Sequence, residues 1–238
     1  YRHGLVAVGT ALTFTINYAM VYAHRVAVLD HLWSLCVEEH GYAILAVVAL
    51  VVRRWSASAV LLVGGLGLAA LLNGVLQSIY IDQDVFDLFA RTDVSVAGLF
   101  LAGALHLLLR NRAGAWTSLI APLALAAGIA VKLFAPDTAL RFGLGMPLLA
   151  LAVATIDVST PGLRKLLSLR WLTQVGLWSF SLYLWQQPFY KMAHDGGPRE
   201  LLFAAAVGAA LASFYGVERP ARRRLNAWIA QATTRAAA

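Results

Sequence analysis

Charged residues are scarce in this sequence: 13% of the 238 residues are Asp, Glu, Lys or Arg, against roughly a quarter in an average soluble domain. Hydrophobic residues make up 60%, and the mean hydropathy is +0.71. A globule of this size has too small an interior to bury so many apolar side chains, so much of the apolar surface must face lipid. The composition excludes a water-soluble globule and predicts an integral membrane protein.

Cysteine is nearly absent as well. The single Cys36 excludes an intrachain disulfide, and the six scattered histidines give no zinc-ribbon or iron–sulfur spacing. His31, Glu38, Glu39 and His40 are residue types that bind metals, but their spacing matches no known ligand motif. We therefore expect no metal and no bound cofactor.

Long polar stretches are also missing. Hydrophobic runs long enough to cross a bilayer, which takes roughly 17 to 25 residues per helix, recur with short polar breaks. We predict an all-α integral membrane protein, with a single membrane domain over residues 1–238, about eight transmembrane helices and no soluble domain. The runs fall at residues 4–22, 37–52, 57–76, 94–109, 117–134, 139–156, 171–190 and 200–217.

The net charge of +7 is concentrated in alternate gaps between these runs. Lys and Arg accumulate in cytoplasmic loops, so these gaps predict the cytoplasmic side and place both termini there. A nucleic-acid interface would need a basic face with interleaved aromatics on a soluble surface, so we expect membrane lipids and no nucleic acid as partners. The basic gaps contain Arg53, Arg54, Arg110, Arg112, Arg164, Lys165, Arg170, Arg219, Arg222, Arg223 and Arg224.

The first polar cluster, residues 31–42, lies at the outer mouth of the second run. Glu38 and Glu39 repel each other when both are ionised, which suits one of them for general acid or base work. Alternatively, both lie in the first turn of a helix, where the macrodipole favours anions. Cys36 and His40 share a helix face and could form a nucleophile and its base, but a lone cysteine in an apolar helix is more often a packing residue.

Two further clusters contain polar side chains near the ends of runs. In residues 178–190, Ser179, Tyr183 and Gln186 share a helix face and can point into a bundle. Alternatively, the amides of Gln186 and Gln187 satisfy carbonyls freed by a kink at Pro188. The third cluster is residues 91–93.

In that third cluster, Thr92 or Asp93 is a natural N-cap for the next helix, and Arg91 could hold a carboxylate or phosphate. Near the last run, we expect Glu218 to pair with a neighbouring Arg. Small residues predict close helix packing at Gly64, Gly65, Gly67, Gly143 and Gly145.

Taken in order, these motifs resemble the acyltransferase type 3 family, bacterial membrane enzymes that O-acylate sugars of lipopolysaccharide and other envelope or secreted glycans. His40 and Gly41 stand where this family commonly has Gln and Phe, and Gln186 stands where it commonly has His. The matching segments are Thr15-Ile16-Asn17-Tyr18; Trp33, Ser34, Leu35, Val37, Glu38, Glu39 and Tyr42 of a W-S-L-x-V-E-E-x-x-Y signature; Arg91-Thr92-Asp93 with Gly98; Ser179 to Pro188; and Glu218-Arg219-Pro220.

The resemblance implies an O-acetyltransferase of the bacterial inner membrane. Its donor substrate would be acetyl-CoA or another acyl-CoA, and its acceptor a hydroxyl of a glycan or lipid-linked sugar. Glu38 and Glu39 are the expected catalytic residues. The expected substrate-binding residues are Trp33, Ser34, Tyr42, Arg91, Asp93, Tyr183 and Gln186.

Members of this family usually begin with a helix that bears an Arg and, about ten residues later, a His. The first run, residues 4–22, contains neither, so we expect further sequence upstream of Tyr1 and a ten-helix core in total. Two alternatives remain open: a polytopic transporter-like protein, which would normally show an inverted repeat, and a non-catalytic fragment of the acyltransferase.

Overall fold

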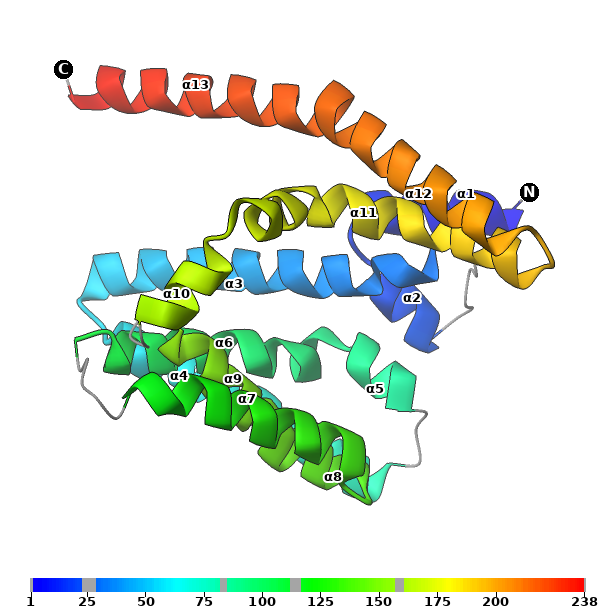
Figure 1. Cartoon of the computed structure of the whole chain (residues 1–238). Coiled ribbons are helices and arrows are strands. Elements are labelled where there is room, and N and C mark those ends of the chain that lie inside the picture. Colours follow the sequence, from blue (N-terminus) through cyan, green and yellow to red (C-terminus); the bar gives the residue numbers. More distant parts are fainter. Residues whose placement is uncertain (1, 23–28, 82–84, 112–116, 157–160, 238) are drawn as a thin grey trace. The chain divides into compact units, whose positions relative to one another are not determined.

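The computed structural model describes residues 2–22, 29–81, 85–111, 117–156 and 161–237, and every regular element in these ranges is helical (Figure 1). The chain divides into two compact units, unit 1 over Tyr1–Leu166 and unit 2 over Leu167–Ala238. The prediction of an all-α protein is confirmed for the described ranges.

Five helical segments are long and apolar enough to cross a membrane, compared with about eight predicted runs. They are Asp30–Trp55, Ala59–Tyr80, Thr92–Leu109, Thr138–Thr155 and Arg199–Gln231. The run at 117–134 contains a shorter apolar helix, Leu119–Phe134. The run at 171–190 lies within the long helix α11 (Arg170–His194), where Gln, Ser and Tyr side chains lower the hydropathy.

The first predicted run, 4–22, is broken near its middle. Helix α1 (Arg2–Leu12) ends before Phe14, whose φ of 53° is left-handed, and α2 (Ile16–Tyr22) follows. At the break, the Thr13 hydroxyl donates to the Gly9 carbonyl at 2.9 Å. Threonine hydroxyls that bond to nearby carbonyls compete with the helical pattern, which is why this apolar run does not form one continuous helix.

The core of unit 1 lies where α6 contacts its neighbours. α4 and α9 pack against α6, α7 packs against α9, and α3 also contacts α6. Ala97 and Phe100 of α6 are buried in this core. The helices involved are α3 (Trp33–Trp55), α4 (Ala59–Tyr80), α6 (Thr92–Leu109), α7 (Thr117–Phe134) and α9 (Met146–Thr155).

Short elements connect these helices. Phe142 lies in the π-helical turn η2, is fully buried and stacks on Phe89 with 4.8 Å between ring centroids. Lys132 Nζ lies 4.9 Å from the centroid of the Phe89 ring. The short elements are η1 (Asp30–Leu32), α5 (Val85–Ala90), α8 (Thr138–Leu140), η2 (Arg141–Gly145) and α10 (Pro161–Leu167).

The glycines of α4 differ in whether a side chain would fit at their position. A Cβ at Gly67 would lie 2.9 Å from the Leu101 backbone nitrogen, so α4 and α6 approach closely only because this residue has no side chain. At Gly64 the nearest atom, the Cβ of Ala104, would be at an ordinary 3.5 Å, and at Gly65 nothing lies within 4 Å. The packing prediction is confirmed for Gly67 and wrong for Gly65, which faces away from the neighbouring helices.

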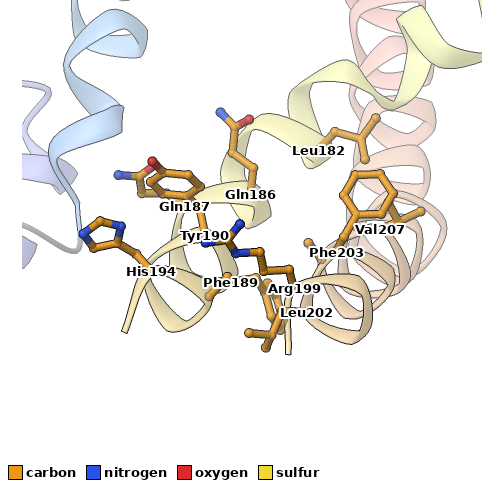
Figure 2. A pocket seen from close by; sticks show the side chains of 12 residues that line it. Leu182, Gln186, Gln187, Phe189, Tyr190, His194, Arg199, Leu202, Phe203 and Val207 are labelled. Carbon is orange, nitrogen blue, oxygen red and sulfur yellow. The ribbon is translucent and has the colours of Figure 1, made fainter. Parts of the chain in front are cut away.

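Unit 2 is built from two long helical segments. α11 packs against α12 (Arg199–Ser213), and α12 continues through the π-helical turn η3 (Phe214–Glu218) into α13 (Arg219–Ala237). α11 and α12 together line a pocket of about 750 Å³, whose side chains are drawn in Figure 2.

We predict that Gly67→Ala destabilises the protein and Gly65→Ala does not. Both variants gain the same helix propensity, about 1 kcal/mol, but only the methyl group at position 67 meets backbone on α6, where overpacking costs about 1–3 kcal/mol. Thermal unfolding in detergent micelles measures the difference. Equal unfolding midpoints for the two variants would contradict the close α4–α6 contact.

Candidate functional site

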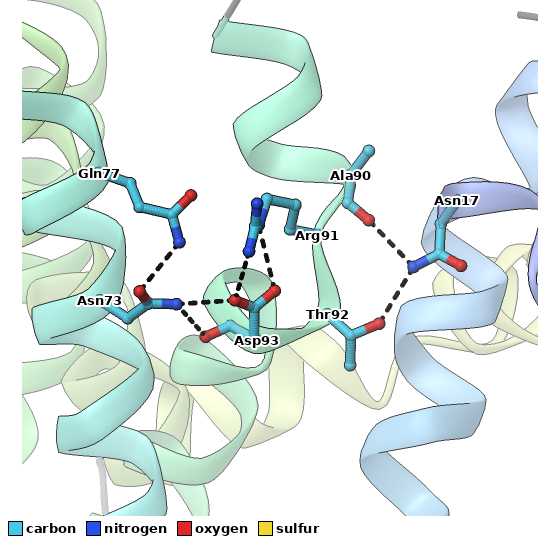
Figure 3. A network of polar contacts seen from close by, with 7 residues as sticks. All are labelled: Asn17, Asn73, Gln77, Ala90, Arg91, Thr92 and Asp93. Carbon is cyan, nitrogen blue, oxygen red and sulfur yellow. Dashed lines mark hydrogen bonds and ion pairs between the residues drawn. The ribbon is translucent and has the colours of Figure 1, made fainter. Parts of the chain in front are cut away.

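The hydroxyl of Thr92 joins three helical segments of unit 1. Asn17 Nδ2 on α2 donates to Thr92 Oγ1 at 3.0 Å and to the Ala90 carbonyl at 3.1 Å (Figure 3). His40 Nδ1 on α3 lies 2.8 Å from the same Oγ1. Residues 17, 40 and 92 are far apart in sequence, so only the fold brings them together.

Thr92 Oγ1 therefore has two side-chain partners. It accepts a hydrogen bond from Asn17 Nδ2, and it shares a second one with His40 Nδ1, whose direction is set by the tautomer of the imidazole. The His40 ring also stacks on Tyr18, with 6.0 Å between ring centroids.

A second chain of hydrogen bonds begins at Arg91 (Figure 3). Its Nε and Nη2 contact the two carboxylate oxygens of Asp93 at 3.2 and 2.9 Å. Asn73 Nδ2 on α4 donates to Asp93 Oδ2 at 2.8 Å, and Gln77 Nε2 donates to Asn73 Oδ1 at 2.9 Å. These bonds to Asp93 raise the pKa of the Arg91 guanidinium above its ordinary value, so Arg91 stays charged.

Two amide oxygens of this region have no partner. Asn17 Oδ1 and Gln77 Oε1 are buried and form no hydrogen bond to any described residue. A buried acceptor without a donor costs about 1–3 kcal/mol. A hydroxyl or water that reached either oxygen would remove this cost, so both atoms are candidate contacts for a polar ligand.

The N-cap prediction for the third cluster was wrong. The residue that caps α6 is Arg91, in an extended conformation and without a side-chain capping bond, and Thr92 is the first helical residue. The Thr92 hydroxyl is free for Asn17 and His40 because it does not cap its own helix.

Helix α3 divides the predicted site residues between two faces. Successive residues turn by about 100°, so Trp33, Cys36 and His40 share one face. This face is inward: Trp33 meets Phe86 edge to face at 5.8 Å, and Cys36 is buried. The buried Cys36 packs against Ile16 and Met20.

The opposite face of α3 carries Ser34, Glu38 and Tyr42, spaced four residues apart. Glu38 and Tyr42 are exposed. Glu39, also exposed, lies about 100° around the helix from His40, whereas Glu38 lies about 160° from it. The structure thus groups Trp33 with His40, and sets Ser34, Glu38 and Tyr42 apart from them.

The placement of Glu38 and Glu39 also tests the alternative that both lie in the first turn of a helix. α3 begins at Trp33, and its first turn contains no acidic residue. Both carboxylates lie in the second turn, where the helix macrodipole acts only weakly. Among the residues that the structure describes, neither forms an ion pair or a side-chain hydrogen bond.

In unit 2, Gln186 is exposed and lines the α11–α12 pocket, whereas Tyr183 does not line it. The expected repair of a kink at Pro188 is absent there: α11 continues to His194, and neither Gln186 nor Gln187 hydrogen-bonds a described residue. Ser179 Oγ donates to the Gly176 carbonyl of its own helix at 2.8 Å.

The last polar motif joins α11 to η3. Ser181 Oγ, on a buried side chain, donates to Glu218 Oε2 at 2.8 Å. Arg222 Nη1 contacts Glu218 Oε1 at 3.3 Å, which confirms the predicted pairing of Glu218 with a nearby arginine.

Sequence reasoning missed Asn73 and Gln77, which were counted as the end of an apolar run and the start of a polar gap. Their spacing of four residues on one helix face was the available signal. No group of three or more His, Cys, Asp or Glu in the described ranges could hold a metal ion.

Compared with known proteins, the chain matches no protein-family model, no curated protein and no solved structure. The resemblance to the acyltransferase type 3 family therefore rests on the motifs alone.

We predict that Thr92→Val lowers the free energy of unfolding by about 1–2 kcal/mol, since an isosteric methyl group leaves Asn17 and His40 without a shared partner. Thr173→Val is the matched control, because Thr173 is exposed on α11. Unfolding in detergent measures the stability, and ¹⁵N shifts of His40 report its tautomer. Equal stability of the two variants with an unchanged His40 spectrum would refute the hydrogen-bond chain.

Proposed function

We propose that the chain functions in a membrane-bound acyltransferase that moves an acyl group, acetyl being the expected one, from acyl-CoA to a hydroxyl of an envelope or secreted glycan. The observation that carries the proposal is the meeting at Thr92. Three segments that resemble the family, those around Asn17, His40 and Arg91, are far apart in the sequence, and Asn17 and His40 each form a hydrogen bond with Thr92.

The two remaining motifs of the resemblance also meet each other. Ser181 belongs to the segment before Pro188, and Glu218 opens the Glu-Arg-Pro motif. Their hydrogen bond at 2.8 Å joins α11 to η3, the turn that follows α12. The motifs therefore supply interhelical polar contacts in both units, which favours a specific polar site over general packing.

The proposed reaction requires one base. The acceptor hydroxyl attacks the thioester carbonyl, a C–O bond forms and the C–S bond breaks, and the hydroxyl proton passes through the base to the departing CoA thiolate. Glu39 and Glu38 are the proposed bases, with Glu39 nearer to His40. Both are exposed and without an ion pair to any described residue, so their oxygens are free to accept a proton.

Arg91 and Asp93 are proposed to position the acceptor rather than to react. The bidentate contact uses Nε and Nη2 of Arg91, which leaves Nη1 for a sugar oxygen or a phosphate. The unpaired oxygens of Asn17 and Gln77 are suited to hydroxyl donors, which a sugar supplies in number.

We place the protein in a bacterial inner membrane with both termini cytoplasmic. In unit 1, α3 and α6 contact each other and run in the same direction (Figure 1). Arg53 and Arg54 at the end of α3 therefore lie on the same side as Arg110, which follows α6. This common basic end supports the assignment of one side as cytoplasmic.

In an acyl-transfer assay, we predict that Glu39→Gln or Glu38→Gln lowers the rate at least about a hundredfold, the usual cost of losing a general base. Cys36→Ser should leave the rate nearly unchanged, because Cys36 is buried among apolar side chains. The assay follows label from acetyl-CoA into glycan in membranes containing the full reading frame to which the chain belongs.

Near-normal transfer by both Glu variants would remove the carboxylates from the mechanism. If the wild-type protein transfers no acyl group but moves a solute across vesicle membranes, the transporter alternative replaces the proposal.

Cysteine labelling from outside tests the proposed membrane topology. Asp195→Cys should react with a membrane-impermeant maleimide added from outside, whereas Arg223→Cys should not. The native Cys36 is buried and contributes little background. Labelling of Arg223→Cys from outside in sealed cells would overturn the cytoplasmic placement of the C-terminus.

A further inference from the structure

The pocket between α11 and α12 is a groove whose character changes along its length. At one end lie His194, near the end of α11, and Arg199, at the start of α12. At the other end lie Leu182 and Val207. With a rise of 1.5 Å per residue, the two ends are separated by roughly 12–18 Å along the helices.

The polar end of the groove carries a cationic side chain that is suited to bind an anion. Arg199 is exposed and forms no ion pair or side-chain hydrogen bond within the described part of the chain. In Figure 2 its guanidinium reaches from α12 toward Tyr190 on α11. The Tyr190 ring stacks on His194. Two acidic residues, Asp195 and Glu200, lie near this end in sequence, but neither lines the groove.

Most of the remaining wall is apolar. Phe189, Leu202 and Phe203 line the groove below the charged end, and Gln186 and Gln187 lie partway along it. Arg199 is the first residue of an apolar helical segment that is long enough to cross a membrane. The groove therefore begins at the boundary of that segment and runs toward its apolar middle.

We propose that this groove binds one anionic phospholipid, with its phosphate on Arg199 and His194 and one acyl chain along Phe203 toward Leu182 and Val207. A volume of about 750 Å³ suits part of a lipid rather than a whole one, because typical ligand pockets measure about 300–1,000 Å³. The order of groups in a phospholipid, with charge at the membrane boundary and hydrocarbon below, matches the order of side chains along the groove.

This site does not depend on acyl transfer. In this site Gln186 lies at the ester region of the lipid. A failure of the acyl-transfer assay would leave the lipid-site proposal unaffected.

The first experiment measures lipid retention by the full chain in detergent, using native mass spectrometry. Phosphatidylglycerol and phosphatidylcholine with identical acyl chains are the probes. We expect the wild-type chain to prefer phosphatidylglycerol, and Arg199→Gln to lower that preference about fivefold. Arg170→Gln is the matched control, because it removes the same charge from an exposed position at the start of α11 and should keep the preference. An equal loss in both variants, or no loss in either, would overturn the site.

The second experiment locates the lipid without a variant. Phosphatidylglycerol with a photoreactive group in its acyl chain should crosslink to peptides within residues 182–207. Excess glycerol phosphate should not displace it, because the groove also holds the chain. Crosslinks confined to other segments, or displacement by soluble phosphate, would refute a lipid site.

Discussion

Within a bilayer, water does not compete for hydrogen bonds, so a buried polar side chain depends on a partner in the protein. In unit 1 this constraint acts at Thr92, whose hydroxyl accepts a hydrogen bond from Asn17 and shares another with His40. Apolar packing around Phe100 joins α3, α4 and α6, and Cys36 of α3 packs against Ile16 and Met20 of α2. Two directional hydrogen bonds of 3.0 and 2.8 Å at this one hydroxyl add polar contacts that connect α2, α3 and α6.

The orientation of α3 follows from that attachment. With His40 held inward, the helical repeat also turns Trp33 and Cys36 inward and leaves Glu38 on the opposite face. A sequence motif that looks like one cluster is thus divided between a structural face and an exposed face. Glu38 lies on the exposed face, and Glu39, also exposed, lies at its edge.

In unit 2 a buried polar side chain also has a partner within the protein. The buried Ser181 is satisfied by Glu218, and Arg222 balances the charge of that carboxylate. Arg199 has no such partner among the described residues, and it lies at the polar end of an otherwise apolar groove. One charge is neutralised within the unit, whereas the other remains available for a lipid phosphate.

The sequence by itself determined the helical membrane class, because apolar content and run length depend on composition alone. It also indicated that Glu38 and Glu39 lie near the start of a helix and that Arg91 lies just before one, since these patterns are local. Thr10, Thr13 and Thr15 around Phe14 were the available signal for the break, but the length of the apolar run outweighed it. Among the described residues, five of the eight predicted runs form helices long and apolar enough to cross a membrane, because run length ignores polar residues within long helices. Only the tertiary structure decided that Asn17 meets Thr92, and that Asn73 meets Asp93. Contacts between helices depend on how side chains pack in three dimensions, which no local pattern encodes.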